Sequence, residues 1–102
     1  MKVIVDLTIV PIGVGVSLSK YVAACEVVLD RPGLTTSLHP NGTSIEGEWD
    51  EVFDAIKACH DKVHAMGAPR IHTNIKLGTR TDREQTMQDK LDSVRTRHLQ
   101  RD

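Results

Sequence analysis

The order of two hydrophobic periods along this chain of 102 residues restricts its fold more than any other feature. Apolar side chains alternate with a period of two, typical of strands with one buried face, in four runs: 3–9, 34–39, 43–48 and 71–77. Apolar residues at helical spacing fill the stretches between the first two runs and between the last two. A further helix is predicted from about Asp82. The sequence therefore predicts a β-α-β-β-α-β order followed by an extra helix.

This order of elements is typical of a ferredoxin-like fold, an α+β sandwich in which two helices pack on a four-stranded antiparallel sheet. Right-handed βαβ halves place the first and third strands at the centre of the sheet and the second and fourth at its edges. A chain of this length allows a single domain, predicted over 1–97. The polar residues 98–102 are predicted to form a frayed tail.

Turn-forming residues set the predicted ends of these elements. Pro11 is expected to end the first strand and Gly78 the fourth. Ser17 or Ser19 is expected to cap the first helix, because a hydroxyl oxygen there can accept a hydrogen bond from a free backbone N–H. The pair Asn41–Gly42 is a strong hairpin signal, so the second and third strands are expected to be neighbours.

The second predicted strand, 34–39, is poorly protected for an edge strand. It contains no lysine, aspartate, glutamate or internal proline, although natural proteins usually block exposed edges with such residues. Pairing with another copy of the chain, or covering by the last helix of another copy, would satisfy its free backbone groups. We therefore expect the chain to be its own partner, in a homodimer or a homotetramer.

Charge and cysteine content argue against several classes of partner. The 13 basic and 14 acidic side chains are spread along the chain and give a net charge of −1, so no nucleic acid is expected as a partner. No apolar run approaches the roughly 18–20 residues of a membrane span, so no membrane partner is expected. Cys25 and Cys59 fall on apolar helix faces without a CxxC spacing, which predicts a reduced, cytoplasmic environment and thiols that act as small hydrophobic groups.

Alternation along the strands sorts their side chains onto two faces. One face is apolar and is expected to pack on the helices: Val3, Val5, Leu7, Ile9, Leu34, Leu38, Ile45, Ile71 and Ile75. The other carries a dense set of donors and acceptors: Asp6, Thr8, Ser37, His39, Ser44, Glu46, Glu48, His72, Asn74 and Lys76. This polar face predicts either a solvated or oligomeric surface or a ligand pocket closed by a second subunit.

No group of residues forms a recognisable catalytic or metal site, so no enzyme, catalytic residue, metal or required cofactor is predicted. His60 and His64 have an i, i+4 spacing that suits a metal, but a third ligand is not evident and His60 is in phase with the buried face. The Gly13–Gly15 loop precedes a helix N-terminus, where anions bind, but lacks a phosphate-binding motif. Glu46 and Glu48 share one strand face, which solvation or ion pairing explains better than catalysis.

Three long runs resemble a family of small thiamine-binding proteins: TIVPIGVGVSLSKYVAA at 8–24, LHPNGTSIEGEWDEVFDAIKACH at 38–60 and MGAPRIHTNIKL at 66–77. The segment TMQDKLDSV at 86–94 resembles the last helix of that family. The resemblance covers nearly the whole chain up to about residue 97, and the combination of TIVP with HP-G-T-IEGEWDEV is specific. It implies a ferredoxin-like fold, a homotetramer built from dimers, and non-catalytic binding of thiamine or its hydroxymethylpyrimidine part.

The resemblance and the chemistry of thiamine together indicate a set of binding residues. Hydroxyl groups can meet the donor and the ring acceptors of the aminopyrimidine. A carboxylate such as Glu46 or Asp6 would favour the cationic thiazolium ring. The motif positions and the hydroxyl groups give the expected ligand-binding residues: Thr8, Pro11, Ser17, Ser37, His39, Thr43, Glu46 and Trp49.

Two other functions stay open on the sequence alone. One is a regulatory or structural oligomer that binds a small anion at the polar face or at the glycine loop. The other is a small enzyme that uses His39 and Glu46 as acid and base.

Overall fold

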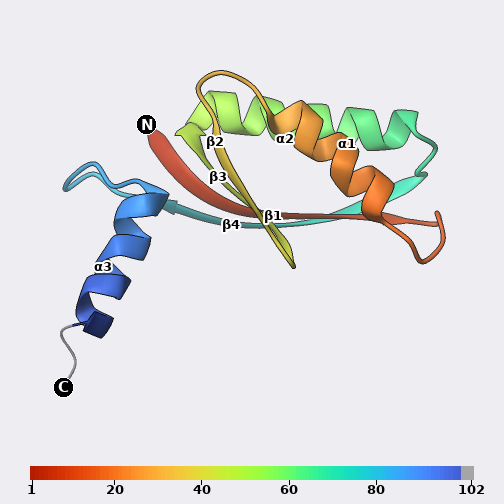
Figure 1. Ribbon diagram of the computed structural model, residues 1–102. Coiled ribbons are helices and arrows are strands. Elements are labelled where there is room, and N and C mark those ends of the chain that lie inside the picture. The colour runs from red at the N-terminus through yellow and green to blue at the C-terminus, as the bar shows by residue number, and fades with distance from the viewer. Residues whose placement is uncertain (100–102) are drawn as a thin grey trace.

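The computed structural model describes residues 1–99, and its elements follow the predicted order (Figure 1). The elements are β1 (Lys2–Ile12), α1 (Ser19–Leu29), β2 (Thr35–His39), β3 (Gly42–Glu48), α2 (Trp49–Ala65), β4 (Arg70–Thr79) and α3 (Met87–Leu99). The strands form a four-stranded antiparallel sheet in the order β2-β3-β1-β4. The predicted ferredoxin-like α+β sandwich, with the first and third strands at its centre, is confirmed.

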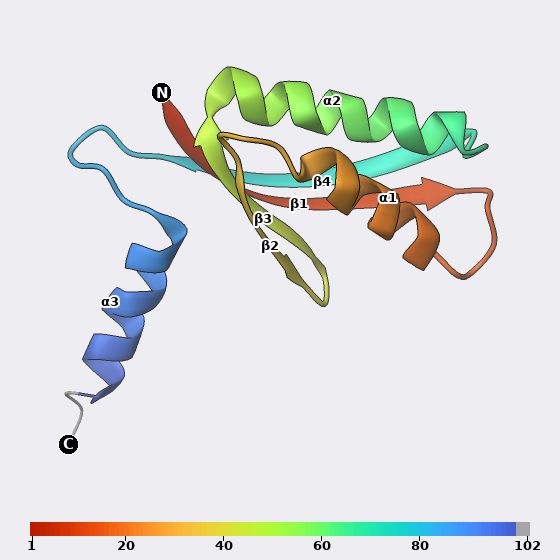
Figure 2. The same ribbon diagram turned by 45° about the horizontal axis from the view of Figure 1, so that its top comes forward.

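Helices α1 and α2 lie side by side on one face of the sheet, whereas α3 projects from the body on the other side (Figures 1 and 2). Residues directly opposite each other in an antiparallel pair point to the same side of the sheet. Because Val5 pairs with Ile45 on β3 and with Leu77 on β4, these three residues share the face that α1 and α2 cover. No helix within residues 1–99 is long and apolar enough to cross a membrane.

The core lies between the two helices and the sheet. Its buried apolar residues come from alternate strand positions, from the inner faces of α1 and α2, and from the turn after α2: Val3, Val5, Leu7, Tyr21, Cys25, Leu29, Ile45, Val52, Ala55, Ile56, Cys59, Val63 and Ala68. Ile9, Leu34 and Ile71 pack against this core from its rim. Leu38 and Ile75 are exposed despite the prediction, and both lie on edge strands, Leu38 on β2 and Ile75 on β4.

The open face of the sheet carries the polar residues that alternation predicts for it. Asp6 pairs with Ser44 on β3 and with Lys76 on β4, and Ser44 pairs in turn with Ser37 on β2. These residues therefore form one polar row across all four strands, on the side away from α1 and α2.

Two strands continue through residues that the sequence predicts to end them. Pro11 lies inside β1, opposite Ile71 of β4, and Gly78 lies inside β4, opposite Ile4. Within residues 1–99, β1 pairs beyond Leu7 with β4 alone, so one side of its backbone has no strand partner there. A proline is tolerated at such a position because its missing N–H removes no ladder hydrogen bond.

Helix α1 begins without the serine cap that the sequence predicts. Its N-cap residue is Leu18, and no side chain caps the helix there. Ser17 lies in the preceding loop, and Ser19 is already the first helical residue. The N-cap position falls one residue away from either serine, so no hydroxyl group occupies it.

Helix α3 begins at Met87 rather than at the predicted Asp82. Thr86 and Asp89 form a reciprocal capping pair, in which each side chain accepts a hydrogen bond from the other's backbone N–H at 3.0 Å. Asp82 instead binds the guanidinium of Arg80, and this hydrogen bond holds the pKa of Asp82 at about 2. The helix includes residues 98 and 99 of the predicted frayed tail, and 100–102 lie outside the described residues.

Candidate functional site

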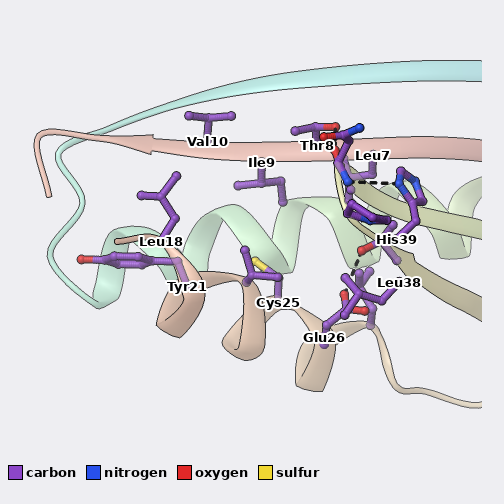
Figure 3. Close-up of a pocket in the computed structure, with 16 residues that line it drawn as sticks. Leu7, Thr8, Ile9, Val10, Leu18, Tyr21, Cys25, Glu26, Leu38 and His39 are labelled. Carbon is purple, nitrogen blue, oxygen red and sulfur yellow. Dashed lines mark hydrogen bonds between the residues drawn. The ribbon is translucent and has the colours of Figure 1, made fainter. Parts of the chain in front are cut away.

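A cavity of about 370 Å³ lies between β1, α1 and the tip of the β2–β3 hairpin (Figure 3). Its wall is formed by Leu7, Thr8, Ile9, Val10, Leu18, Tyr21, Val22, Cys25, Glu26, Leu29, Leu38, His39, Pro40, Asn41, Gly42 and Thr43. Its volume is within the range of cavities that bind small organic ligands.

The cavity exists because the two neighbours of β1 stop pairing with it at different points. The pairing of β1 with β3 ends at Leu7 and Thr43, whereas its pairing with β4 continues to Ile12 and Arg70. Beyond Leu7 the sheet continues on the β4 side alone, because β3 begins at the hairpin turn, and space is left beside α1. The register of the sheet, rather than any single side chain, makes this space.

Two polar contacts tie the hairpin tip to β1 beside the cavity. His39 Nε2 lies 2.7 Å from Asp6 Oδ1, and the Thr8 hydroxyl donates a hydrogen bond of 2.8 Å to the Asn41 carbonyl oxygen. His39 Nδ1 accepts a hydrogen bond from the Asn41 backbone N–H at 3.3 Å. Nδ1 is thus the acceptor of the ring, and Nε2 carries the hydrogen that it donates to Asp6. These contacts fix the wall that the hairpin tip contributes.

Gly42 allows the hairpin to approach β1 closely. A Cβ atom at this position would lie against the Leu7 carbonyl oxygen and 2.8 Å from Thr8 Oγ1, closer than such atoms are found in proteins. Only a residue without a side chain fits here while the Thr8–Asn41 hydrogen bond is kept. The glycine of the predicted Asn41–Gly42 hairpin signal therefore also shapes the cavity.

Most of the cavity wall is apolar. Ile9, Leu18, Tyr21 and Leu29 contribute aliphatic or aromatic surface from β1 and α1. Leu38 faces the cavity from the hairpin tip (Figure 3). Its side chain is apolar, yet 59% of its surface is exposed. Such walls favour a flat or aliphatic ligand, which would remove this exposed surface from water.

A carboxylate and a hydroxyl lie close together in the wall, which also contains the polar residues Thr8, His39 and Asn41. The Thr43 hydroxyl donates a hydrogen bond of 3.0 Å to Glu26 Oε2, and Thr43 is only 6% exposed. Glu26 Oε1 accepts no hydrogen bond from the residues that the structure describes. The pair therefore presents hydrogen-bond acceptors to a ligand inside a mostly apolar cavity.

Three of the eight expected ligand-binding residues line this cavity, namely Thr8, His39 and Thr43. Ser37 lies on the open face of the sheet, opposite Ser44, and Ser17 lies exposed in the loop before α1. Pro11 belongs to β1 but lies outside the wall of the cavity.

Glu46 and Trp49, the other two expected residues, also lie outside the cavity wall. Glu46 Oε2 accepts a hydrogen bond of 2.8 Å from the Met87 backbone N–H at the start of α3. Trp49 begins α2, is 41% exposed and packs on Phe53 with ring centroids 5.0 Å apart. Since His39 binds Asp6 and Glu46 binds α3, the two residues of the acid/base hypothesis have separate structural partners.

Glu26 is the cavity residue that sequence reasoning missed. It follows Cys25 in a predicted helix whose other inner residues are apolar, and it is the single acidic residue of α1. The feature of the sequence that could have pointed to Glu26 is an isolated carboxylate next to the buried face of a helix. Its partner Thr43 comes from β3, so only the fold shows that the two meet.

The histidines and cysteines of α1 and α2 have structural partners. His60 Nε2 lies 2.7 Å from Thr73 Oγ1, and His64 Nδ1 lies 2.8 Å from the Ala68 carbonyl oxygen. Within residues 1–99 no group of three metal-ligating side chains is present. Cys25 and Cys59 are buried and unbridged, and the pKa of Cys59 is raised by its hydrogen bond with Cys25 and by burial. The predicted role of both thiols as small hydrophobic groups agrees with this burial.

The fold and the cavity define a small ferredoxin-like protein with an apolar cavity beneath its hairpin tip and one carboxylate inside that cavity. The sequence model of one family, described as thiamine-binding protein, matches residues 5–95. The chain belongs to this thiamine-binding protein family.

Relatives and solved structures agree with this assignment. A UPF0045 protein of Synechocystis is 62% identical over 96 residues, which cover 94% of this chain and 79% of the relative. The crystal structure of a hypothetical protein from Methanocaldococcus jannaschii matches with a TM-score of 0.84 at 33% identity, and the match covers 91% of this chain and 95% of that one.

A Thermotoga maritima structure shares the fold. Its name proposes a part in thiamine biosynthesis or salvage, and it matches with a TM-score of 0.78 at 20% identity, over 92% of this chain and 99% of that one.

Proposed function

We propose that this chain is a cytoplasmic, homo-oligomeric protein that binds thiamine or its hydroxymethylpyrimidine part without catalysing a reaction. The observation that carries the proposal is the apolar cavity beside α1, with the Glu26–Thr43 pair in its wall. Membership of the thiamine-binding protein family supports the choice of ligand.

The chemistry of the cavity suits an aminopyrimidine. Its flat ring would lie against apolar side chains of the wall such as Leu38, which lowers the free energy by removing apolar surface from water. Its exocyclic amino group donates hydrogen bonds, and the oxygens of Glu26 and Thr43 can accept them. In thiamine the thiazolium ring adds a positive charge, which the Glu26 carboxylate attracts.

A bulky residue inside the cavity is expected to abolish binding. Val22 lines the cavity from α1, so Val22→Trp would fill the space that the ligand needs. Titration calorimetry with thiamine and with hydroxymethylpyrimidine should give saturable binding to the native chain and background heat for the variant. Bound ligand should also raise the free energy of unfolding of the native chain, by about 2.7 kcal/mol at a hundredfold excess over the dissociation constant.

The matched control is Val27→Trp, on the same helix. Val27 is 75% exposed and lies outside the cavity wall, so this variant should bind like the native chain. Equal binding by both variants would contradict the proposed location of the site. Background heat for the folded native chain with both compounds would contradict the proposed ligand.

The homo-oligomeric part of the proposal rests on two exposed elements. Edge strand β2 is short and exposed, and in the described chain its outer side has no strand partner. Leu91 and Val94 lie exposed on α3, which has no buried residue. Backbone groups of a sheet edge and apolar side chains of a projecting helix are both stabilised by a second copy.

Light scattering is expected to give a mass of two or four chains at micromolar concentration. Replacing Leu91 and Val94 together by aspartate should lower this mass, because charges would take the place of apolar contacts. Ser93→Asp adds a charge to the same helix as a control and should leave the assembly unchanged. A monomer in the native chain would contradict the proposal.

A further inference from the structure

We infer that the backbone of Ile9 is a specificity-determining edge of the cavity, which selects ligands that carry a hydrogen-bond donor directly beside an acceptor. The inference rests on the proposed function and adds to it the part of the ligand that the protein reads. Its basis is a stretch of β1 whose backbone, within residues 1–99, has no strand partner on one side.

Two contacts show which residues of β1 direct their backbone groups toward β3. The Met1 carbonyl oxygen accepts a hydrogen bond of 2.9 Å from the Trp49 N–H, directly after β3. A Cβ atom on Gly42 of β3 would lie against the Leu7 carbonyl oxygen, so this oxygen also points toward β3. In an antiparallel sheet the N–H and C=O of one residue point to the same side, and this side alternates along the strand. Odd-numbered residues of β1 therefore face β3, and even-numbered residues face β4.

Ile9 and Pro11 are the next residues that face this side, but the pairing of β1 with β3 ends at Leu7. Pro11 has no N–H, so this stretch of the edge offers the N–H of Ile9 and the carbonyl oxygens of Ile9 and Pro11. No hydrogen bond from a turn or loop backbone group reaches Ile9 within residues 1–99. The Asn41 carbonyl oxygen of the hairpin tip binds the Thr8 hydroxyl instead. Ile9 thus supplies one donor and one acceptor that the fold does not use.

This free edge faces the cavity. Ile9 and Val10 line the cavity from β1, and residues 38–43 line it from the hairpin tip, so the cavity extends along β1 beyond Leu7. Figure 3 shows the Ile9 side chain on the α1 side of β1 and the Val10 side chain on the opposite side, as strand alternation requires. A ligand beside the strand therefore meets the Ile9 N–H and C=O where a residue of β3 would otherwise pair.

An aminopyrimidine matches this pair of backbone groups. The donor and the acceptor of an extended residue lie close together and point the same way. The amino group of an aminopyrimidine donates, and the ring nitrogen beside it accepts, so both can bind Ile9 at once. The amino group has a second hydrogen, which the Glu26 carboxylate in the same cavity can accept. Peptides that add to the edge of a sheet use the same backbone hydrogen bonds.

The edge acts on specificity because unpaired backbone groups are costly in an apolar site. In the ligand-free chain water can bind the Ile9 N–H and C=O. A ligand without the matching edge would displace that water and leave both groups unpaired, which costs more than the loss of a solvated hydrogen bond. Sites built to hydrogen-bond a ligand therefore reject analogues that lack the partner group.

Two pyridine analogues of hydroxymethylpyrimidine test which ring nitrogen is read. One has carbon in place of the ring nitrogen beside the amino group, and the matched control has carbon in place of the other ring nitrogen. In calorimetry the first analogue should bind the native chain about tenfold or more weakly than hydroxymethylpyrimidine, because it leaves the Ile9 N–H unpaired. The control should bind nearly as well as the parent compound.

Amide exchange, measured by NMR, tests the Ile9 N–H directly. In the ligand-free chain it should exchange faster than the N–H groups of Thr8 and Val10, which face β4 and belong to its ladder. Saturation with hydroxymethylpyrimidine should shift the Ile9 amide resonance and slow its exchange by about tenfold or more. The amides of Thr8 and Val10 should change little.

Ile9→Pro removes the donor in the way that the chain already does at Pro11. No ladder hydrogen bond is lost, because the Ile9 N–H faces away from β4. Ile9→Val is the matched control, since it also shortens the side chain but keeps the N–H. We expect Ile9→Pro to bind hydroxymethylpyrimidine about tenfold or more weakly than Ile9→Val does. Melting without ligand checks that both variants fold, and if Ile9→Pro does not, the two measurements on the native chain decide.

The outcomes separate this inference from the proposed function. If the native chain binds hydroxymethylpyrimidine but the Ile9 amide neither shifts nor slows, or if the two analogues bind equally, the inference is wrong while the proposed function stands. Slow exchange of the Ile9 amide without ligand would mean that the edge is already paired, and would overturn the inference as well. If the folded native chain binds neither thiamine nor hydroxymethylpyrimidine, the proposed function is wrong and this inference falls with it.

Discussion

Gly42→Ala is expected to lower the free energy of unfolding by about 1–3 kcal/mol, the usual cost of forcing extra atoms into a packed site. The added Cβ would press on the Leu7 carbonyl and on Thr8 Oγ1, and neither is the far end of a flexible side chain. The hairpin tip must then move away from β1. Because the Thr8–Asn41 hydrogen bond spans this contact, we expect it to lengthen or break.

The same substitution is expected to weaken thiamine binding by about tenfold or more, equivalent to at least about 1.4 kcal/mol. The hairpin tip contributes Leu38 and His39 to the cavity wall, so its displacement alters the site without removing any lining side chain. Calorimetry measures the affinity, and urea denaturation measures the stability.

Gly78→Ala is the matched control, since Gly78 lies in β4 of the same sheet and a Cβ atom there would meet no atom within 4 Å. This variant should be as stable as the native chain or slightly more stable, because alanine restricts the unfolded chain. Equal behaviour of the two variants would show that the close approach of Gly42 to β1 is not important.

Leu29→Ala is expected to destabilise the fold by about 2–5 kcal/mol, in line with other buried leucine truncations. Leu29 is 1% exposed at the end of α1, where it is part of the core and also lines the cavity. Truncation removes apolar burial and enlarges the space beside α1. Because the core of a 102-residue chain is small, we expect the urea midpoint to fall sharply.

Val27→Ala provides the comparison on the same helix. Val27 is 75% exposed, so its truncation should change the free energy of unfolding by no more than about 0.5 kcal/mol. If Leu29→Ala were as stable as Val27→Ala, the packing of α1 on the sheet would differ from the one described.

The architecture could be predicted from the sequence because it depends on local patterns. Period-two runs identified all four strands, helical spacing identified α1 and α2, and chain order fixed which strands are central. Boundaries were less predictable, because they depend on particular contacts that the hydrophobic pattern does not show. Pro11 continues β1 since β4 alone pairs there, and Asp82 does not start α3 since Arg80 binds it.

The candidate site was predictable only in part, for the same reason. Thr8, His39 and Thr43 were expected and do line the cavity, because the family motifs surround the hairpin and the first strand. Glu26 was missed, since its meeting with Thr43 depends on how α1 crosses the sheet. Glu46 was expected in the site but binds the start of α3, a contact between residues 41 positions apart in the sequence.

The unequal lengths of the two ladders on β1 have an evolutionary consequence. Backbone pairing encloses the cavity, and side chains such as Leu18 and Val22 of the α1 segment only decide what fits inside it. Selection on ligand preference can therefore act at Leu18 and Val22, which lie outside the buried core, whereas Tyr21 and Leu29 serve both the core and the cavity. A lineage with this scaffold can exchange one small molecule for another through a few substitutions along α1, while inheriting the sheet and its hairpin unchanged.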